Sequence, residues 1–418
     1  MTNRRALTAA ISVVVAAAGC GSDPSTGEVV QSSKSRIVAP QVASADVDQL
    51  AADNSAFAVD LYQAARLGSG NMVFSPASIS IALAMTYAGA EGTTASQMAT
   101  TLHFTLPAER LHPAWNALDL ALTAPAAMSG AFQLNLANAL WAQQGFTMQP
   151  SFLDLLAENY GAGVRLVDFA GATEQARQAI NRWVSGETAG RIPELLQMGV
   201  LDPSTALVLT NAVYFKADWL MPFKPNSPSG TFNAPAGPVT VPMMTGDFSV
   251  PVWTGPGYSA TALPYAGGGA SMVLIVPDAG TFDSFEATLT ADTLATIVAG
   301  AAGGVGGGVV VPRFTFDQRL SLATTLQALG MTDAFDASRA DFSGIDGQRD
   351  LFISDVVHQA NIAVDEKGTV AAAATAVVIS KAALFVPSLR VDRPFIFLIR
   401  DDATGSTLFM GRVLDPSQ

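Results

Sequence analysis

The chain has 418 residues, 49% of them hydrophobic and 14% charged, so it is too apolar for a disordered protein and long enough to bury a large core. Its 22 basic and 35 acidic residues give a net charge of −13, which argues against nucleic acid or an anionic membrane surface as a partner. One cysteine and three histidines exclude a disulfide framework and argue against a metal site built from several Cys or His side chains.

Residues 1–19 are predicted to be an export signal. Arg4 and Arg5 precede an apolar run from Ala6 to Ala18, which is shorter than the roughly 20 residues that a membrane-spanning helix needs. The stretch Ala17-Ala18-Gly19-Cys20 is similar to a bacterial lipobox and predicts lipidation of Cys20. The alternative is an ordinary secretory signal in which the cysteine falls by chance. We therefore expect an exported protein, lipid-anchored at a bacterial envelope or cell surface, or extracellular.

The next segment, residues 20–45, is predicted to be the lipidated cysteine and a flexible tether. It is rich in Ser, Gly, Pro and Gln and has little apolar periodicity. The folded domain is expected to span residues 46–418.

Three helices are expected in the first half of this domain, at residues 47–67, 75–90 and 173–188, from apolar residues at helical spacing. Strand-like runs dominate the remainder: residues 132–141, 207–215, 271–276, 308–316, 351–364, 394–400 and 406–413. Helices lead and strands follow without strict alternation, which predicts an α+β fold with antiparallel or mixed sheets.

The glycine cluster at residues 303–308 does not have the pattern of a phosphate-binding loop. Val309, Val310 and Val311 follow it in place of Gly-Lys-Ser/Thr and a helix. A flexible turn before a strand is therefore expected there.

No arrangement of catalytic residues is present in the sequence. GxSxG, HExxH, SxxK and a GxGxxG that opens a helix are all missing, and His358 lies in an apolar strand pattern typical of a hydrogen-bonded core histidine. We expect no catalytic residues, no cofactor and no metal, and hence no enzyme.

One segment has conflicting local preferences. Residues 368–380 carry no charge; Ala371 to Ala374 favour a helix, whereas Thr375 and the residues Val377 to Ile379 favour a strand. Such a conflict is expected at a functional or switching site.

Four blocks of sequence in order resemble the serpin family, over about residues 48–416. They are Asn71 to Ile79 (NMVFSPASI), Thr210 to Trp219 (TNAVYFKADW), Asp365 to Thr375 (DEKGTVAAAAT), and Asp392 to Phe397 (DRPFIF) with Phe409 to Val413 (FMGRV). The resemblance implies a fold of three β-sheets and about nine helices with an exposed reactive loop. It also implies inhibition of serine or cysteine proteases, in which the cut loop inserts as a new strand into the main sheet and traps the acyl-enzyme.

The resemblance also implies roles for individual residues. The hinge is Glu366, Lys367, Gly368, Thr369, Val370, Ala371, Ala372, Ala373, Ala374 and Thr375; the shutter below the main sheet is Ser75, Ser78, Asn211 and His358; Arg313 and Trp219 lie at the top of that sheet, with Arg313 paired to Glu366. On insertion, Thr369, Ala371, Ala373, Thr375, Val377 and Ile379 would share the buried face, because side chains alternate along a strand. Val370 replaces the glutamate common in the family, but it lies on the outward face.

The family's usual spacing from Gly368 places the cut at Ala382-Ala383, which suits a protease with a shallow, elastase-like or subtilisin-like pocket. A spacing one residue shorter would place it at Lys381-Ala382 and suit a trypsin-like protease. The expected partner is the protease itself, bound covalently by a monomer, and the membrane is contacted only through the lipid.

The alternative function is a non-inhibitory binding lipoprotein with the same fold. Such members typically carry charged residues, bulky residues or proline in the hinge, and none of these lies between Gly368 and Ser380.

Overall fold

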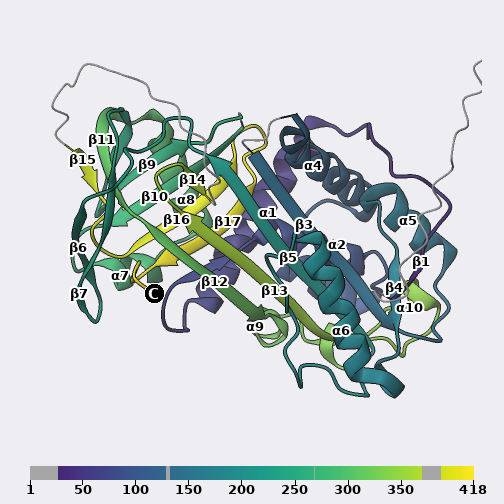
Figure 1. Ribbon diagram of the computed structural model, residues 1–418. Helices are drawn as coiled ribbons and strands as arrows, with labels where there is room; N and C mark the ends of the chain where they lie inside the picture. The colour runs from purple at the N-terminus through teal and green to yellow at the C-terminus, as the bar shows by residue number, and fades with distance from the viewer. Residues whose placement is uncertain (1–26, 129–131, 268, 370–386) are drawn as a thin grey trace, which may run out of the picture.

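The computed structural model describes residues 27–128, 132–267, 269–369 and 387–418. Two sheets pack against each other there; most of the helices lie around one end of the pair, whereas α7 and α8 lie against the ten-stranded sheet (Figure 1). The helices are α1 (Ser44–Ala65), α2 (Pro76–Tyr87), α3 (Gly92–Thr101), α4 (Ala108–Met128), α5 (Pro150–Tyr160), α6 (Phe169–Glu187), α7 (Phe282–Ala287), α8 (Ala291–Gly303), α9 (Ala323–Ala328) and α10 (Ser343–Asp346), with a 3-10 turn at Asp333–Phe335.

Sheet A has the strand order β1-β4-β3-β5-β14-β13-β12. Its strands are β1 (Glu28–Val30), β3 (Phe132–Gln143), β4 (Val164–Val167), β5 (Leu207–Asp218), β12 (Phe314–Ser321), β13 (Ile353–Val364) and β14 (Gly368–Thr369).

The other sheet has ten strands in the order β2-β17-β16-β10-β9-β8-β11-β7-β6, with β15 also paired to β11. They are β2 (Met72–Phe74), β6 (Ser229–Ala234), β7 (Gly237–Thr245), β8 (Val250–Gly255), β9 (Tyr258–Pro264), β10 (Ala270–Pro277), β11 (Val305–Pro312), β15 (Pro387–Arg390), β16 (Phe395–Asp401) and β17 (Thr407–Val413). This sheet divides within β11, whose first residues pair with β8 and whose last residues pair with β7. Together with sheet A, the two parts correspond to the three sheets expected.

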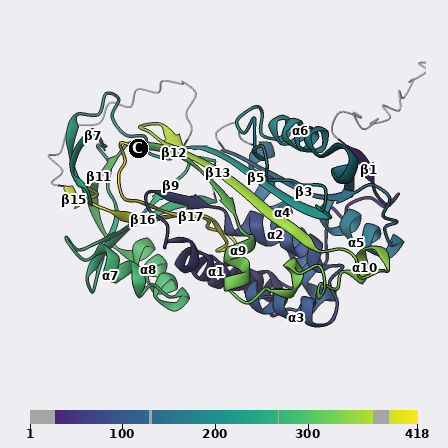
Figure 2. The same ribbon diagram turned by 90° about the horizontal axis from the view of Figure 1, so that it is seen from below.

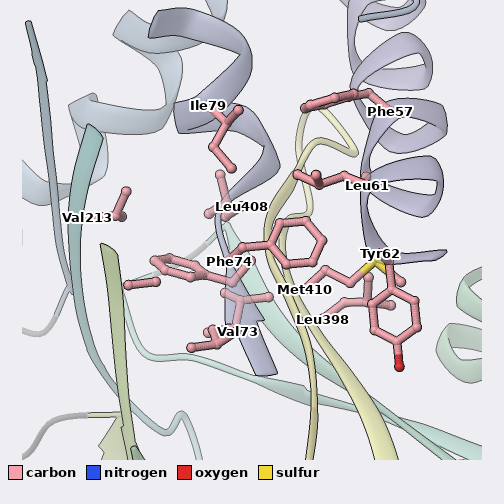
Figure 3. Close-up of a cluster of buried hydrophobic side chains, with 14 of the residues drawn as sticks. Phe57, Leu61, Tyr62, Val73, Phe74, Ile79, Val213, Leu398, Leu408 and Met410 are labelled. Carbon is pink, nitrogen blue, oxygen red and sulfur yellow. The ribbon is translucent and has the colours of Figure 1, made fainter. Parts of the chain in front are cut away.

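The main core lies between the two sheets and below α1 and α2. Figure 3 shows Phe57 and Leu61 of α1 packed near Phe74 of β2 and Met410 of β17. Burial of each such side chain is worth roughly 1.5–3 kcal/mol. A second cluster fills the opposite face of sheet A below α6, and Figure 2 shows α6 on one side of that sheet and α1 and α2 on the other.

The tether predicted for residues 20–45 is wrong from residue 27 onward. β1 pairs with the edge strand β4, with Glu28 opposite Leu166 and Val30 opposite Val164. Further along, Arg36 donates to Asn116 Oδ1 at 2.8 Å and to Asp119 at 2.6 Å. Strand-edge pairing and polar contacts help to hold this segment, so hydrophobic periodicity does not reveal it, and the described residues from Gly27 onward belong to the folded body.

The glycine-rich turn predicted at residues 303–308 is also corrected. Gly306 to Gly308 lie within β11 rather than in a turn. The space beside this strand is narrow: a Cβ atom on Gly304 would lie 2.4 Å from the backbone carbon of Val252, and one on Gly306 would lie 2.9 Å from Ser249 Oγ. Glycine here allows a close approach to β8. The strand expected at residues 308–316 is in fact the end of β11 and the start of β12, which belong to different sheets.

The three predicted helices are present as α1, α2 and α6, whereas α3, α4, α5, α7, α8, α9 and α10 were not predicted. Among the described helices, none has the length and hydropathy that a membrane span requires.

Candidate functional site

Sheet A is split at one end, and a two-residue strand fills the split. β5 and β13 pair directly as parallel strands from Leu207 as far as Tyr214. Beyond that point β14 lies between them, with Thr369 opposite both Ala217 of β5 and Val364 of β13. The start of the predicted hinge therefore already belongs to sheet A, while β5 and β13 close the remaining length by pairing with each other.

The space around β14 determines its residue types. A Cβ atom on Gly368 would lie 2.1 Å from the carbonyl oxygen of Ala217, so only glycine fits. Thr369 is 1% exposed and pairs with Ala217 and Val364, which both belong to the main core cluster. Its side chain thus faces the core, which sets the face that each following residue would take if the strand continued.

Trp219, predicted at the top of the sheet, holds the turn that leads into β14. Its Nε1 donates to the carbonyl oxygen of Asp365 at 2.9 Å, and its backbone N–H donates to that of Lys367 at 2.7 Å. The backbone N–H of Phe223 donates to the carbonyl oxygen of Glu366 at 2.8 Å. Three successive residues, the last two of them in the predicted hinge, are therefore bonded to the segment that follows β5.

The charge pair expected between Arg313 and Glu366 is present, with Arg313 Nη1 3.7 Å from Glu366 Oε2. Burial opposes ionisation of Glu366, but hydrogen bonding to Ser227 and the charge of Arg313 outweigh it and lower the pKa of this carboxyl group. The Arg313 side chain is 49% exposed, so the pair itself contributes at most ~1 kcal/mol.

The four shutter residues meet below the middle of sheet A. Ser75 caps α2, and its Oγ accepts from the backbone N–H of Ser78 at 3.3 Å. Asn211 of β5 donates to Ser78 Oγ at 2.6 Å and bonds through Oδ1 to His358 Nδ1 on β13. The network therefore joins β5 and β13, the two strands that would have to separate to admit a longer insert.

His358 is neutral in this network. The backbone N–H of Ser75 donates to Nε2 at 3.1 Å, which leaves the ring proton on Nδ1, facing Asn211. The imidazole is fully buried, and burial lowers its pKa to about 3. The histidine is a structural hydrogen-bonding group, as expected from its apolar strand pattern.

Two further residues complete the site and were not predicted from the sequence. Asn138 of β3 accepts from Ser78 Oγ at 3.0 Å, and Asn211 also donates to it. The hydroxyl group of Tyr265, just after β9, lies 2.7 Å from Thr369 Oγ1. Asn138 is a polar residue inside a strand pattern, which is a weak signal, and no local pattern in the sequence marks Tyr265.

Some predicted positions lie outside the described residues. They are Cys20, the hinge residues Val370, Ala371, Ala372, Ala373, Ala374 and Thr375, and the reactive-bond residues Lys381, Ala382 and Ala383. Within the described residues, no group of three or more His, Cys, Asp or Glu side chains could hold a metal ion.

Comparison with known proteins gives consistent matches along the chain. A sequence model of the serpin (serine protease inhibitor) family matches residues 52–416. Leukocyte elastase inhibitor A of Mus musculus is 38% identical over 390 residues, covering 88% of this chain and 100% of that protein. A serpin-like protein of Thermococcus kodakarensis is 39% identical over 369 residues, covering 87% of this chain and 84% of its own.

Solved structures agree with these matches. The native state of tengpin, a thermophilic serpin, has a TM-score of 0.81 at 28% identity and covers 92% of this chain and 97% of its own. Thyroxine-binding globulin in complex with thyroxine has a TM-score of 0.76 at 29% identity, covering 88% and 99%. The match to the family model over most of the chain, together with a fold in which the hinge enters the split in sheet A, shows that this chain belongs to the serpin family.

Proposed function

We propose that the protein is a suicide-substrate inhibitor of serine proteases, with cysteine proteases as the other target class. The observation that carries the proposal is the position of β14 between β5 and β13. A cut in the loop that follows would free residues 370 onward to extend this strand into sheet A, antiparallel to both neighbours.

The pairing of Thr369 sets the register of such an extension. Thr369 lies opposite Ala217, so each step of two residues along the insert moves two residues back along β5. Ala371 would then lie opposite Phe215, and Ile379 opposite Leu207 at the far end of the strand. The residues on this inner face, from Ala371 to Ile379, are all small, apolar or threonine, so the buried face receives no charge.

In the same register Thr375 would lie between Asn211 and His358. Insertion must break the hydrogen bond that now joins these two side chains. A threonine hydroxyl donates and accepts, so it can satisfy both groups at once. The shutter can thus open without leaving a buried polar group unpaired. An unpaired buried donor or acceptor would cost about 1–3 kcal/mol.

The chemistry is the protease's own. Its nucleophile attacks the carbonyl carbon of Ala382, an ester or thioester forms, and the bond to Ala383 breaks with release of the new amine. Insertion then adds a strand about 33 Å long, the length of ten residue steps in β5, and draws the acyl-linked protease with it before water can hydrolyse the ester or thioester. Lys381-Ala382 is the alternative bond. Relatives named as leukocyte elastase inhibitors favour the small residue, Ala382, as the bait.

The test is to mix the body from Gly27 onward separately with elastase, subtilisin and trypsin and to analyse each mixture on denaturing gels. A stable complex is expected, with a released C-terminal peptide that starts at Ala383, or at Ala382 for the trypsin-like bond. The same proteases with a blocked active-site nucleophile are the control and should give no complex. Cleavage without a complex in all three mixtures, and without a gain in thermal stability, would support the non-inhibitory alternative.

We further propose that Cys20 is lipidated and anchors the protein at the bacterial envelope or cell surface. The support is the signal-like sequence of residues 1–19 and the small residues before the cysteine. Mass spectrometry of the membrane-extracted protein should find a lipid-modified N-terminal Cys20. The Cys20→Ala variant should be absent from the membrane fraction. An unmodified N-terminus beyond Cys20 would contradict the anchor.

A further inference from the structure

The hydroxyl group of Tyr265 connects the ten-stranded sheet to the inserted end of the hinge. Tyr265 follows β9, and its backbone N–H donates to the carbonyl oxygen of Ala270 at 2.9 Å, so its position belongs to that sheet. Its hydroxyl group lies 2.7 Å from Thr369 Oγ1 in sheet A. Among the described residues, Thr369 is the one hydrogen-bonding partner of this hydroxyl. If Thr369 left the split, the tyrosine would keep a buried polar group without a partner.

The tyrosine ring is held on both sides. Trp219 stacks on it with ring centroids 4.5 Å apart and an angle of 8° between the planes. Phe215 meets it edge to face at 5.3 Å and 73°. The ring is 2% exposed, so the hydroxyl group cannot turn to solvent or follow a departing hinge. Burial also raises the pKa of Tyr265, which keeps the hydroxyl group protonated.

β14 itself is short. Two residues contribute few backbone hydrogen bonds, and a strand this short opens easily. The side-chain bond to Tyr265 therefore adds to the small number of hydrogen bonds that an inserted Thr369 makes and a released one would lose.

We infer that Tyr265 is a positioning residue that latches Thr369 between β5 and β13 before the loop is cut, so that insertion starts from a strand whose register is already set. A slip of one residue would turn every inserted side chain to the other face of the sheet. The use of the latch in trapping rests on the proposed function, whereas the latch itself does not.

Hydrogen exchange in the uncut protein tests the latch directly. Tyr265→Phe and Thr369→Val each remove one hydroxyl group and keep the side-chain shape. Each should speed exchange of the β14 amides about fivefold, the factor expected for one neutral hydrogen bond. The double variant should show no further increase. Tyr62→Phe is the matched control, because the buried Tyr62 hydroxyl bonds to Glu286 at 2.6 Å, away from the hinge. Unchanged exchange at β14 in Tyr265→Phe would overturn the latch.

Two synthetic peptides test the consequence for insertion. A peptide with the sequence of residues 368–379 must displace β14 to enter sheet A, whereas one with residues 370–379 need not. Tyr265→Phe should speed uptake of the long peptide about fivefold more than uptake of the short one, and Tyr62→Phe should change both rates alike. An unchanged ratio would exclude a role for Tyr265 in insertion. If β14 exchanges faster in Tyr265→Phe but neither peptide enters any form of the protein, the latch stands and the proposed insertion fails.

Discussion

His358 is held neutral by burial, and this makes the uncut protein sensitive to acid. Its pKa falls from 6.5 to about 3 in the folded protein. Below pH 6.5 the unfolded chain therefore binds a proton that the folded chain does not, and the free energy of unfolding falls as pH falls from 6.5 towards 3, by up to ~1.4 kcal/mol per pH unit. Protonation would also remove the acceptor that Nε2 offers to Ser75.

Denaturant unfolding between pH 7.5 and 4 measures this dependence. His358→Gln cannot titrate, yet its amide can replace both hydrogen bonds, so its unfolding free energy should fall less steeply with acid. His112 is the comparison, because burial lowers its pKa to about 4 and its contribution remains in that variant. An equally steep decline in His358→Gln and in the unaltered protein would contradict the assignment.

Thr369 faces the core, so a charge at this position should block insertion. We expect Thr369→Arg to expel β14, since an unpaired buried charge costs several kcal/mol. The variant should be cut by the target protease without forming a gel-stable complex. Val370→Glu is the matched control, because alternation along the strand places this residue on the outward face, and it should still form the complex. A full yield of complex from Thr369→Arg would exclude insertion in this register.

The elements at the split in sheet A are held together partly by charge. Arg313→Glu would place two carboxylates side by side where Arg313 now meets Glu366. On heating, this variant should form polymers or convert to an inserted form sooner than the unaltered protein, as followed by native gels and size-exclusion chromatography.

The rescue experiment separates charge from packing. The double variant Arg313→Glu with Glu366→Arg restores an opposite pair and should recover most of the resistance to heating. The effect should also shrink at high salt, because the arginine is half exposed. If Arg313→Glu stays monomeric on heating, or if the double variant polymerises as readily as Arg313→Glu, the ion pair does not stabilise sheet A against premature insertion.

Completion of sheet A should change the stability of the whole molecule. Insertion of residues 370–379 would add a strand paired on both sides and bury Val377 and Ile379, at roughly 1.5–3 kcal/mol each. Clean cutting of the loop should therefore raise the melting temperature, on the order of 10 °C or more. Differential scanning calorimetry before and after cutting measures this. The melting temperature of the Thr369→Arg variant should not rise after its loop is cut. If the melting temperature of the unaltered protein does not rise either, a non-inhibitory serpin is favoured.

Local pattern was sufficient for the elements that bury a repeating set of apolar side chains. The helix that begins after Ser75 and the strands around Val213 and His358 are of this kind, since their hydrophobic spacing is visible within about ten residues. The same patterns missed α4, where Pro113 interrupts the helical spacing, and β1, a three-residue strand that pairs with the edge strand β4.

The site divides in the same way. The uncharged hinge, the shutter residues and the pair of Arg313 with Glu366 could be predicted from short stretches of sequence and their resemblance to a family. The neighbours of Thr369 could not, because Tyr265 is 104 residues away and is placed beside Thr369 by tertiary contacts, including backbone pairing with Trp219 after β5. The register of β14, and with it the side chains that an inserted loop would meet, depends likewise on strands that pair across more than 140 residues of chain.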